Sequence, residues 1–192
     1  MLLEHLIYSA ALALIVGIFF VRYTKRDPTW IIILMTIAPD VDYVVNKAML
    51  FAGFEFPYII NHGDFHNLVG LTVFCLLGAI VFSRFGIRFG DALLCSVLGY
   101  VAHFAEDFIV YPPAYCYLYP FKYVDYGINL IPETANLVIA GTEVLLVGVG
   151  VFSLALCIRM YADGGKLSLA YMTDSLVSAK NVFVSKEYHR FL

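Results

Sequence analysis

Both the fold and the function of this chain are predicted from one segment, Gly99-Tyr100-Val101-Ala102-His103-Phe104-Ala105-Glu106-Asp107. It lies inside an apolar run, residues 92–111, that has the length a helix needs to cross a bilayer. His103 and Asp107 are four residues apart, so a helix would place them on one face, about one turn from each other. Ionisable groups in hydrocarbon are costly and mark a functional site, and an imidazole with a carboxylate can hold a metal ion. The segment therefore predicts a metal site inside a membrane.

The composition is that of an integral membrane protein. Of the 192 residues, 61% are hydrophobic and 14% are charged, whereas soluble domains are about 45–50% apolar and about 25% charged. The mean hydropathy is +0.83. The net charge of −3 argues against a nucleic-acid partner. We therefore expect membrane lipid to surround the chain.

Hydrophobic runs predict an all-α membrane protein, a bundle of about five transmembrane helices. The runs are residues 5–23, 29–50, 65–82, 92–111 and 135–160. The second run is interrupted at Pro39-Asp40-Val41-Asp42, where proline removes a backbone donor and should break the helix. We assign residues 1–163 to the transmembrane domain and 164–192 to an amphipathic tail that would associate with the membrane or with a second copy of the chain.

Basic residues predict the orientation of these spans. With five crossings, one side carries nearly all of them, and this side should be cytoplasmic. These residues are Arg22, Lys25, Arg26, Arg84, Arg88, Arg159 and Lys166. The N-terminus would then face outward from the cell (inner) membrane, and the tail would be cytoplasmic.

Histidines and aspartates from four spans fall in the outer half of the membrane under this topology. The predicted ligand set is His5, Asp40, Asp42, His62, His66, His103 and Asp107. The set exceeds what one four-coordinate ion needs, so it could serve one ion or two about 3.5–4 Å apart. Imidazole with carboxylate suits zinc best, and iron or manganese are also compatible. The sequence therefore predicts a divalent metal cofactor.

Parts of this set also have purely structural interpretations. The break at Pro39 could be a helix end near the surface, with both aspartates solvated. His62 and His66, expected to share a helix face, could be a pair of interfacial histidines. His103 could simply hydrogen-bond to Asp107 without any metal.

Asp42 and Glu106 are the predicted catalytic bases. Glu106 lies on a different helix face from His103, so it would either reach in from the side or bind a neighbouring helix. Glu143, inside the fifth run, is a weaker candidate that could hydrogen-bond to another helix or orient a ligand. The aromatic segment 111–126 contains three prolines and should form a cap on the outer surface beside the site.

The order of these motifs resembles the YdjM-like family of membrane-bound metal-dependent hydrolases. The matching residues are His5, Pro39-Asp40-Val41-Asp42, His62 with His66, His103 with Asp107, and Leu118-Tyr119-Pro120-Phe121. The resemblance covers about residues 1–125 and implies hydrolytic chemistry, with a ligand pattern loosely similar to that of zinc-dependent phospholipases C. The family tends to carry an arginine after its first paired histidine, where this chain has Gly63. That difference implies altered contacts with the substrate.

We therefore predict a membrane-embedded, zinc-type hydrolase. It would cleave a phosphoester of an amphipathic substrate, a lipid or polyprenyl phosphate, through a metal-activated water. One alternative is a metal-ion or proton transporter. Transporters tend to show inverted repeats and a site near the midplane, and neither feature is found in the sequence. The other alternative is a non-catalytic membrane protein with a structural metal.

Overall fold

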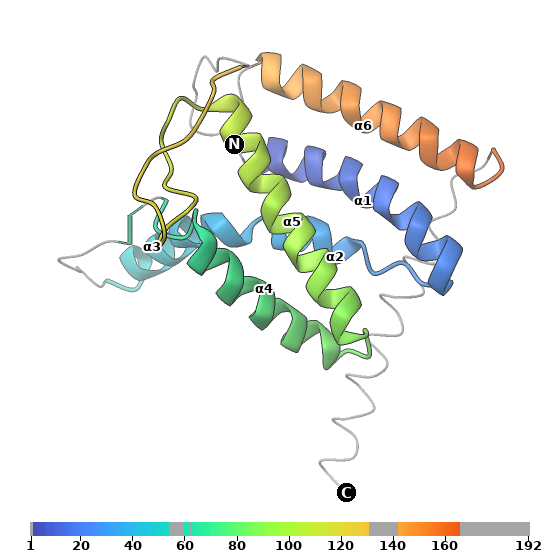
Figure 1. Cartoon of the computed structure of the whole chain (residues 1–192), viewed down its shortest axis with the longest axis horizontal. Coiled ribbons are helices and arrows are strands. Elements are labelled where there is room, and N and C mark those ends of the chain that lie inside the picture. The colour runs from blue at the N-terminus through green and yellow to red at the C-terminus, as the bar shows by residue number, and fades with distance from the viewer. Residues whose placement is uncertain (1, 54–59, 62, 131–141, 166–192) are drawn as a thin grey trace, which may run out of the picture.

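The structure, a computed structural model, describes residues 2–53, 60–61, 63–130 and 142–165. In this part of the chain the regular structure is helical, and one isolated antiparallel bridge joins Tyr115 to Tyr126. Figure 1 shows the helices α1 (Leu2–Thr24), α2 (Trp30–Met35), η1 (Ala38–Asp40, a 3-10 helix), α3 (Val41–Phe51), α4 (Leu68–Ser83), α5 (Phe89–Val110) and α6 (Thr142–Ala162). The predicted all-α membrane fold is confirmed.

Three of the helices, α1, α5 and α6, are long and apolar enough to cross a membrane. Helix α4 is equally apolar but has 16 residues, about one turn fewer than the roughly 20 that a full crossing needs. The remaining predicted span is interrupted. The five expected crossings therefore appear as three long helices, one shorter helix and one broken segment.

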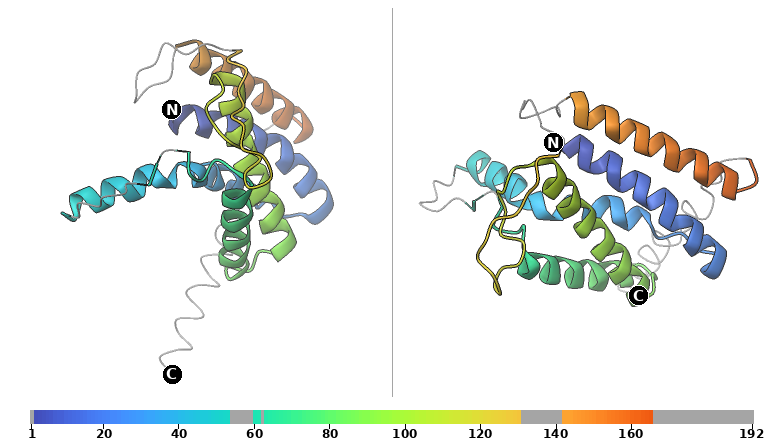
Figure 2. Two further views of the ribbon diagram at one scale, coloured as in Figure 1. Left: turned by 60° about the vertical axis from the view of Figure 1, so that its left-hand side comes forward. Right: turned by 45° about the horizontal axis from the view of Figure 1, so that its top comes forward.

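The break in the second span lies where Pro39 predicts it. Helix α2 ends at Met35, Pro39 lies in η1, and α3 begins at Val41. Figure 2 shows that α3 then projects away from the bundle formed by the other helices. Its last residue, Phe51, is 96% exposed. The break thus keeps α2 inside the bundle and leaves Asp40 at the point where the chain departs.

Helix α5 is the centre of the packing. It contacts α4, α2 and α1, and α1 in turn packs against α6 (Figure 1). The main apolar core draws on α1, α2, α4 and α5 and consists of Ala13, Phe20, Ile31, Ile32, Met35, Ala79, Ala92 and Cys95. Because so many of these side chains are small, the helices approach closely, as membrane helices generally do.

Gly99 sets the closest of these approaches. A Cβ atom added there would overlap the carbonyl oxygen of Ile32 and would lie 3.0 Å from the Cβ of Met35. The absence of a side chain therefore lets the backbone of α2 lie directly on α5. This contact is one helical turn before His103 on the same helix.

A buried ion pair closes the opposite end of the bundle. Arg159, in the last turn of α6, is fully buried, and its Nη1 atom lies 3.2 Å from Oδ2 of Asp27. Its Nε atom donates to Asp163 at 2.9 Å. Arg159 is one of the basic residues that predict the cytoplasmic side, and Gly17 leaves space on α1 for its buried side chain. The pair fixes the end of α6 to the connection between α1 and α2.

We expect Gly99→Ala to destabilise the protein by about 1–3 kcal/mol, because the added methyl group overpacks the contact between α5 and α2. Gly90→Ala is the matched control on the same helix, since a Cβ there meets nothing within 4 Å. Thermal unfolding in detergent micelles measures both. Equal melting temperatures for the two variants would contradict the role given to Gly99.

Candidate metal centre

Three ligand atoms meet where α5 ends, near the start of α4. The Nε2 atoms of His66 and His103 are 3.0 Å apart, and Oδ2 of Asp107 lies 3.2 Å from each of them. Four atoms that surround zinc at about 2.0–2.1 Å are about 3.3 Å from one another in a tetrahedron. The triangle therefore has the size of one face of a zinc coordination shell. All three side chains are at most 2% exposed.

Asp40 flanks the same two imidazoles. Its Oδ1 atom lies 3.5 Å from Nε2 of His66 and 3.6 Å from Nε2 of His103. The side chain is 20% exposed, unlike the others of the cluster. It comes from η1, so the break at Pro39 brings it to α5. Asp40 therefore marks the open side of the cluster.

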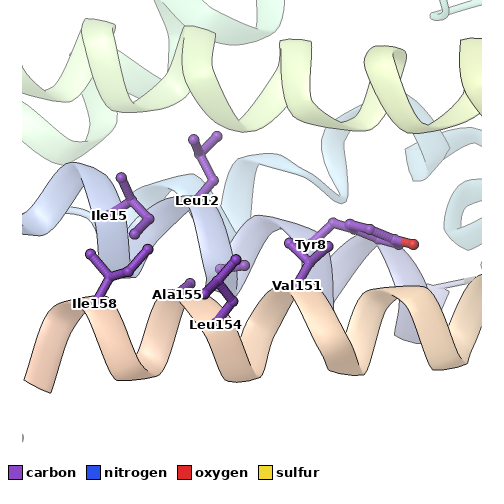
Figure 3. A pocket seen from close by; sticks show the side chains of 8 residues that line it. Tyr8, Leu12, Ile15, Val151, Leu154, Ala155 and Ile158 are labelled. Atoms are coloured by element: carbon purple, nitrogen blue, oxygen red, sulfur yellow. The ribbon is translucent and has the colours of Figure 1, made fainter.

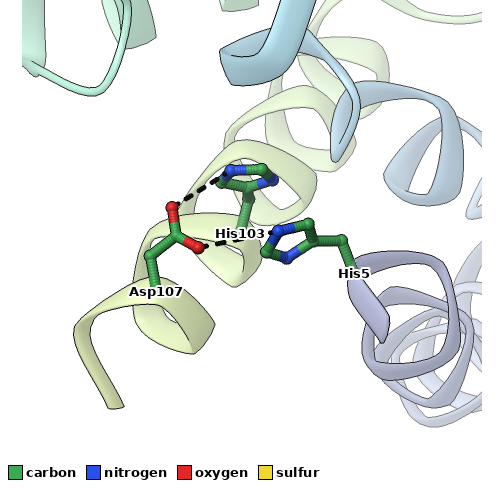
Figure 4. A group of neighbouring side chains, drawn as sticks. All are labelled: His5, His103 and Asp107. Carbon is green, nitrogen blue, oxygen red and sulfur yellow. Dashed lines mark ion pairs between the residues drawn. The ribbon is translucent and has the colours of Figure 1, made fainter. Parts of the chain in front are cut away.

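His5 brings the first helix into the cluster. Figure 4 shows its imidazole beside that of His103, with Asp107 facing both. The two rings stack with centroids 3.8 Å apart and planes at 25°. Nε2 of His5 lies 3.6 Å from Oδ1 of Asp107, and Nδ1 lies 2.8 Å from Oε2 of Glu106. His5 thus faces Asp107 with one nitrogen and Glu106 with the other.

Hydrogen bonds fix which nitrogen of each ring is free to bind a metal. Nδ1 of His103 donates to the carbonyl oxygen of Thr36 at 2.8 Å. A carbonyl can only accept, so Nδ1 carries the proton and Nε2 presents its lone pair to the cluster. The bond between His5 and Glu106 does the same for His5. Metal-binding histidines usually have such a partner on their other nitrogen, which orients the ring.

His66 lies in a turn and not on a helix, which corrects the expected helical pair with His62. The turn begins at Gly63, whose φ of +100° favours glycine. Asn67 ends it by capping α4, where its side chain accepts from the backbone N–H of Gly70 at 3.0 Å. His62 itself lies outside the described residues. The turn aims His66 at α5 from the side.

Tyr100 attaches this turn to α5. Its hydroxyl donates to the carbonyl oxygen of Phe65 at 2.6 Å, and the side chain is fully buried. Tyr100 precedes His103 by three residues and lies on the same helix face. The second span and the turn that carries His66 therefore both pack against one face of α5. The residues of this face are Gly99, Tyr100, His103 and Asp107.

The aromatic loop lies over His66, as a cap beside the site was expected to do. The ring of Tyr115 stacks on the imidazole of His66 with centroids 4.4 Å apart and planes at 14°. Burial raises the pKa of the Tyr115 phenol, and nearby Asp107, Asp40 and Asp42 raise it further. The phenol therefore stays neutral at physiological pH. Tyr115 shields the histidine without adding charge.

Asp42 and Glu143 do not contribute to the ligand triangle. Asp42 is buried in the first turn of α3, and Glu143 is exposed in the first turn of α6. Among the described residues, two groups of three have ligand atoms close enough to hold an ion jointly, His5 with His103 and Asp107, and Asp40 with His66 and His103. The triangle of His66, His103 and Asp107 shares two members with each of them. Neither group contains Asp42 or Glu143. The predicted tail lies outside the described residues beyond residue 165.

A separate groove runs between α1 and α6. Figure 3 shows that apolar side chains line it, and its volume is about 300 Å³. The lining residues are Tyr8, Ala11, Leu12, Ile15, Val151, Leu154, Ala155 and Ile158. Tyr8 turns its hydroxyl away to donate to the carbonyl oxygen of Val144 at 3.0 Å. The groove therefore offers hydrocarbon surface and none of the ligand atoms described above.

The long apolar helices, with histidines and carboxylates buried at one end, define an integral membrane protein with a candidate metal centre. Comparison with known families supports this class. Residues 1–173 match the family described as YdjM inner membrane protein. The chain belongs to this family and is an inner membrane protein. No curated protein and no solved structure matches it.

Three contributors to the site were not predicted from the sequence. Thr36 acts through its backbone carbonyl, which leaves no signal in the residue type. Tyr115 comes from a loop whose many tyrosines are equivalent in the sequence. Tyr100 could have been found, because it shares a helix face with His103 and a buried tyrosine hydroxyl needs a partner.

We expect Tyr100→Phe to weaken metal binding by about tenfold, because the turn carrying His66 loses its attachment to α5. Competition with a chromophoric chelator measures the affinity of the purified protein for Zn²⁺. Tyr117→Phe is the matched control, since the buried Tyr117 hydroxyl makes no hydrogen bond within the described residues. If Tyr100→Phe bound zinc as tightly as Tyr117→Phe, the positioning role would be wrong.

Proposed function

We propose that this protein is a membrane-embedded, metal-dependent hydrolase of zinc type that cleaves a phosphoester in an amphipathic lipid or polyprenyl substrate. The triangle formed by His66, His103 and Asp107 is the observation that carries the proposal. Three protein ligands with one coordination position left open are typical of catalytic zinc, whereas structural zinc is closed by four. The hydrogen bond from His103 to Thr36 adds the orienting partner that metal ligands require.

A bound divalent ion would polarise the scissile group and lower the pKa of the attacking water. His66, His103 and Asp107 would hold it and keep their nitrogens and oxygen aimed at one point. Asp40 was predicted as a ligand, but its larger distances and its exposure favour accepting the proton of the water instead. Glu106 was predicted as a base, and its bond to His5 favours the orienting role. Asp42 stays a predicted base.

The position of the cluster supports an amphipathic substrate. Most of the basic side chains named above lie at the opposite end of the bundle, where Arg159 is bound to Asp27. By the positive-inside rule the cluster would then face outward. The groove between α1 and α6 reaches Tyr8, one turn along α1 from His5, and offers apolar surface for a chain. A molecule with a polar head and a hydrocarbon tail suits both features.

The same arrangement argues against a carrier. Residues of the main apolar core, among them Ala13, Ile32 and Met35, lie between the cluster and the Arg159–Asp27 pair. A carrier needs polar groups along a path through the membrane and a site near its midplane. The described residues place the ionisable groups at the two ends, which suits chemistry at one surface.

We expect His103→Ala to abolish both bound metal and hydrolysis, because it removes one of three ligands. Asp40→Asn should keep the metal and slow hydrolysis by about 10²–10⁴-fold, the contribution typical of a general base. Elemental analysis of protein purified without chelators gives the metal, and phosphate release from short-chain lipid phosphoesters gives the rate. Asp91→Asn, at the other end of α5, is the control for loss of an aspartate from this helix.

Other outcomes would count against the proposal. Full metal content in both His103→Ala and Asp107→Asn would show that these residues form a hydrogen-bonded pair without a metal. Loss of the metal from Asp40→Asn would return Asp40 to the ligand set. Uptake of divalent ions by liposomes containing the protein, without any turnover of phosphoesters, would favour a carrier.

A further inference from the structure

The imidazoles of His5 and His103 are stacked on each other. Their centroids are 3.8 Å apart and their planes differ by 25°, so the rings are nearly parallel. Each ring has its Nδ1 proton engaged, by Glu106 in one case and by Thr36 in the other. The Nε2 atom of each ring faces a different oxygen of Asp107. The distance between the ring centroids is close to the separation of about 3.5–4 Å between the ions of two-metal sites.

Asp107 divides its two oxygens between these positions. Oδ2 faces His66 and His103 at 3.2 Å, and Oδ1 faces His5 at 3.6 Å. Figure 4 shows the carboxylate on one side of the two rings, with one oxygen turned to each. An ion within the triangle uses Oδ2, which leaves Oδ1 and Nε2 of His5 as a second pair of ligand atoms.

We propose that this second pair binds a second divalent ion, with Asp107 as the carboxylate that bridges both ions and Glu106 as the group that orients His5. The inference rests on the first metal site of the proposed function and adds to it. Glu106 also places a buried carboxyl group beside the second position, hydrogen-bonded to Nδ1 of His5. His5 thus becomes a metal ligand supplied by the first turns of α1.

A two-ion site narrows the substrate class. Two ions this close stabilise both the attacking and the leaving oxygen of an in-line displacement, which is the arrangement used for phosphoesters. The bond cleaved would then be a P–O bond, with the attacking water transferring its hydroxyl group to phosphorus. The displaced oxygen would take up a proton as it leaves.

Manganese provides a test that does not depend on turnover. We expect the full-length protein in detergent to bind two Mn²⁺ per chain and to show the multiline spectrum of a spin-coupled pair in electron paramagnetic resonance. His5→Ala should bind one Mn²⁺ per chain and show the six-line spectrum of an isolated ion. Ser9→Ala, one turn further along α1 and equally buried, is the matched control and should keep the coupled pair.

Glu106→Gln covers the case in which His5→Ala does not fold. It preserves the shape of the side chain but weakens the bond to Nδ1 of His5, so the affinity of the second site should fall by about 10–100-fold while the first site is retained. Unchanged affinity at both sites in this variant would oppose the inference.

The outcomes also separate this inference from the proposed function. One Mn²⁺ per wild-type chain, lost in His103→Ala and kept in His5→Ala, would overturn the second site and leave the hydrolase proposal standing. His5 would then be a cation paired with Glu106 and Asp107. Absence of bound metal from the wild type would overturn both proposals.

Discussion

The site depends on how closely the backbone of the second span can lie against α5. Gly99 permits that approach, because any side chain there would strike the carbonyl of Ile32. One turn later, His103 uses the same proximity to donate to the carbonyl of Thr36 at 2.8 Å. In a membrane both groups would be costly without a partner. The bond therefore satisfies a carbonyl near the broken end of α2 and also sets the direction of a metal-binding nitrogen.

The buried ionisable groups are paired differently at the two ends of the bundle. Arg159 and Asp27 neutralise each other, and Arg159 also binds Asp163. At the other end, lone pairs and carboxylate oxygens face one another across 3.0–3.6 Å. Such acceptors repel unless a proton or a cation lies between them. The first arrangement is a neutralised ion pair, whereas the second is the one for which we propose a bound cation.

Much of the fold and of the candidate site could be predicted from residue spacing. The four-residue interval from His103 to Asp107 fixed their shared face, and Pro39 fixed the break in the second span. Spacing failed at His66, because the H-x3-H pattern assumes a helix that Gly63 and the capping residue Asn67 prevent. For Glu106, spacing left open a base or a partner to a neighbouring helix, and the structure shows its hydrogen bond to His5 of α1, 101 residues away. Contacts through backbone carbonyls, such as that of Thr36, leave no mark on residue identity.

The position of Asp107 near the end of α5 determines which side chains its carboxylate can contact. It comes almost at the end of α5, so its carboxylate lies beyond the apolar core yet is still 2% exposed. From that depth its two oxygens can serve different partners, His66 and His103 with one and His5 with the other. One turn earlier on the same face is His103, and one turn before that is Gly99, which packs against α2. Helix α5 ends three residues after Asp107. The contribution of α5 to the candidate ligand set is therefore limited to about one turn, which begins directly after the contact with α2.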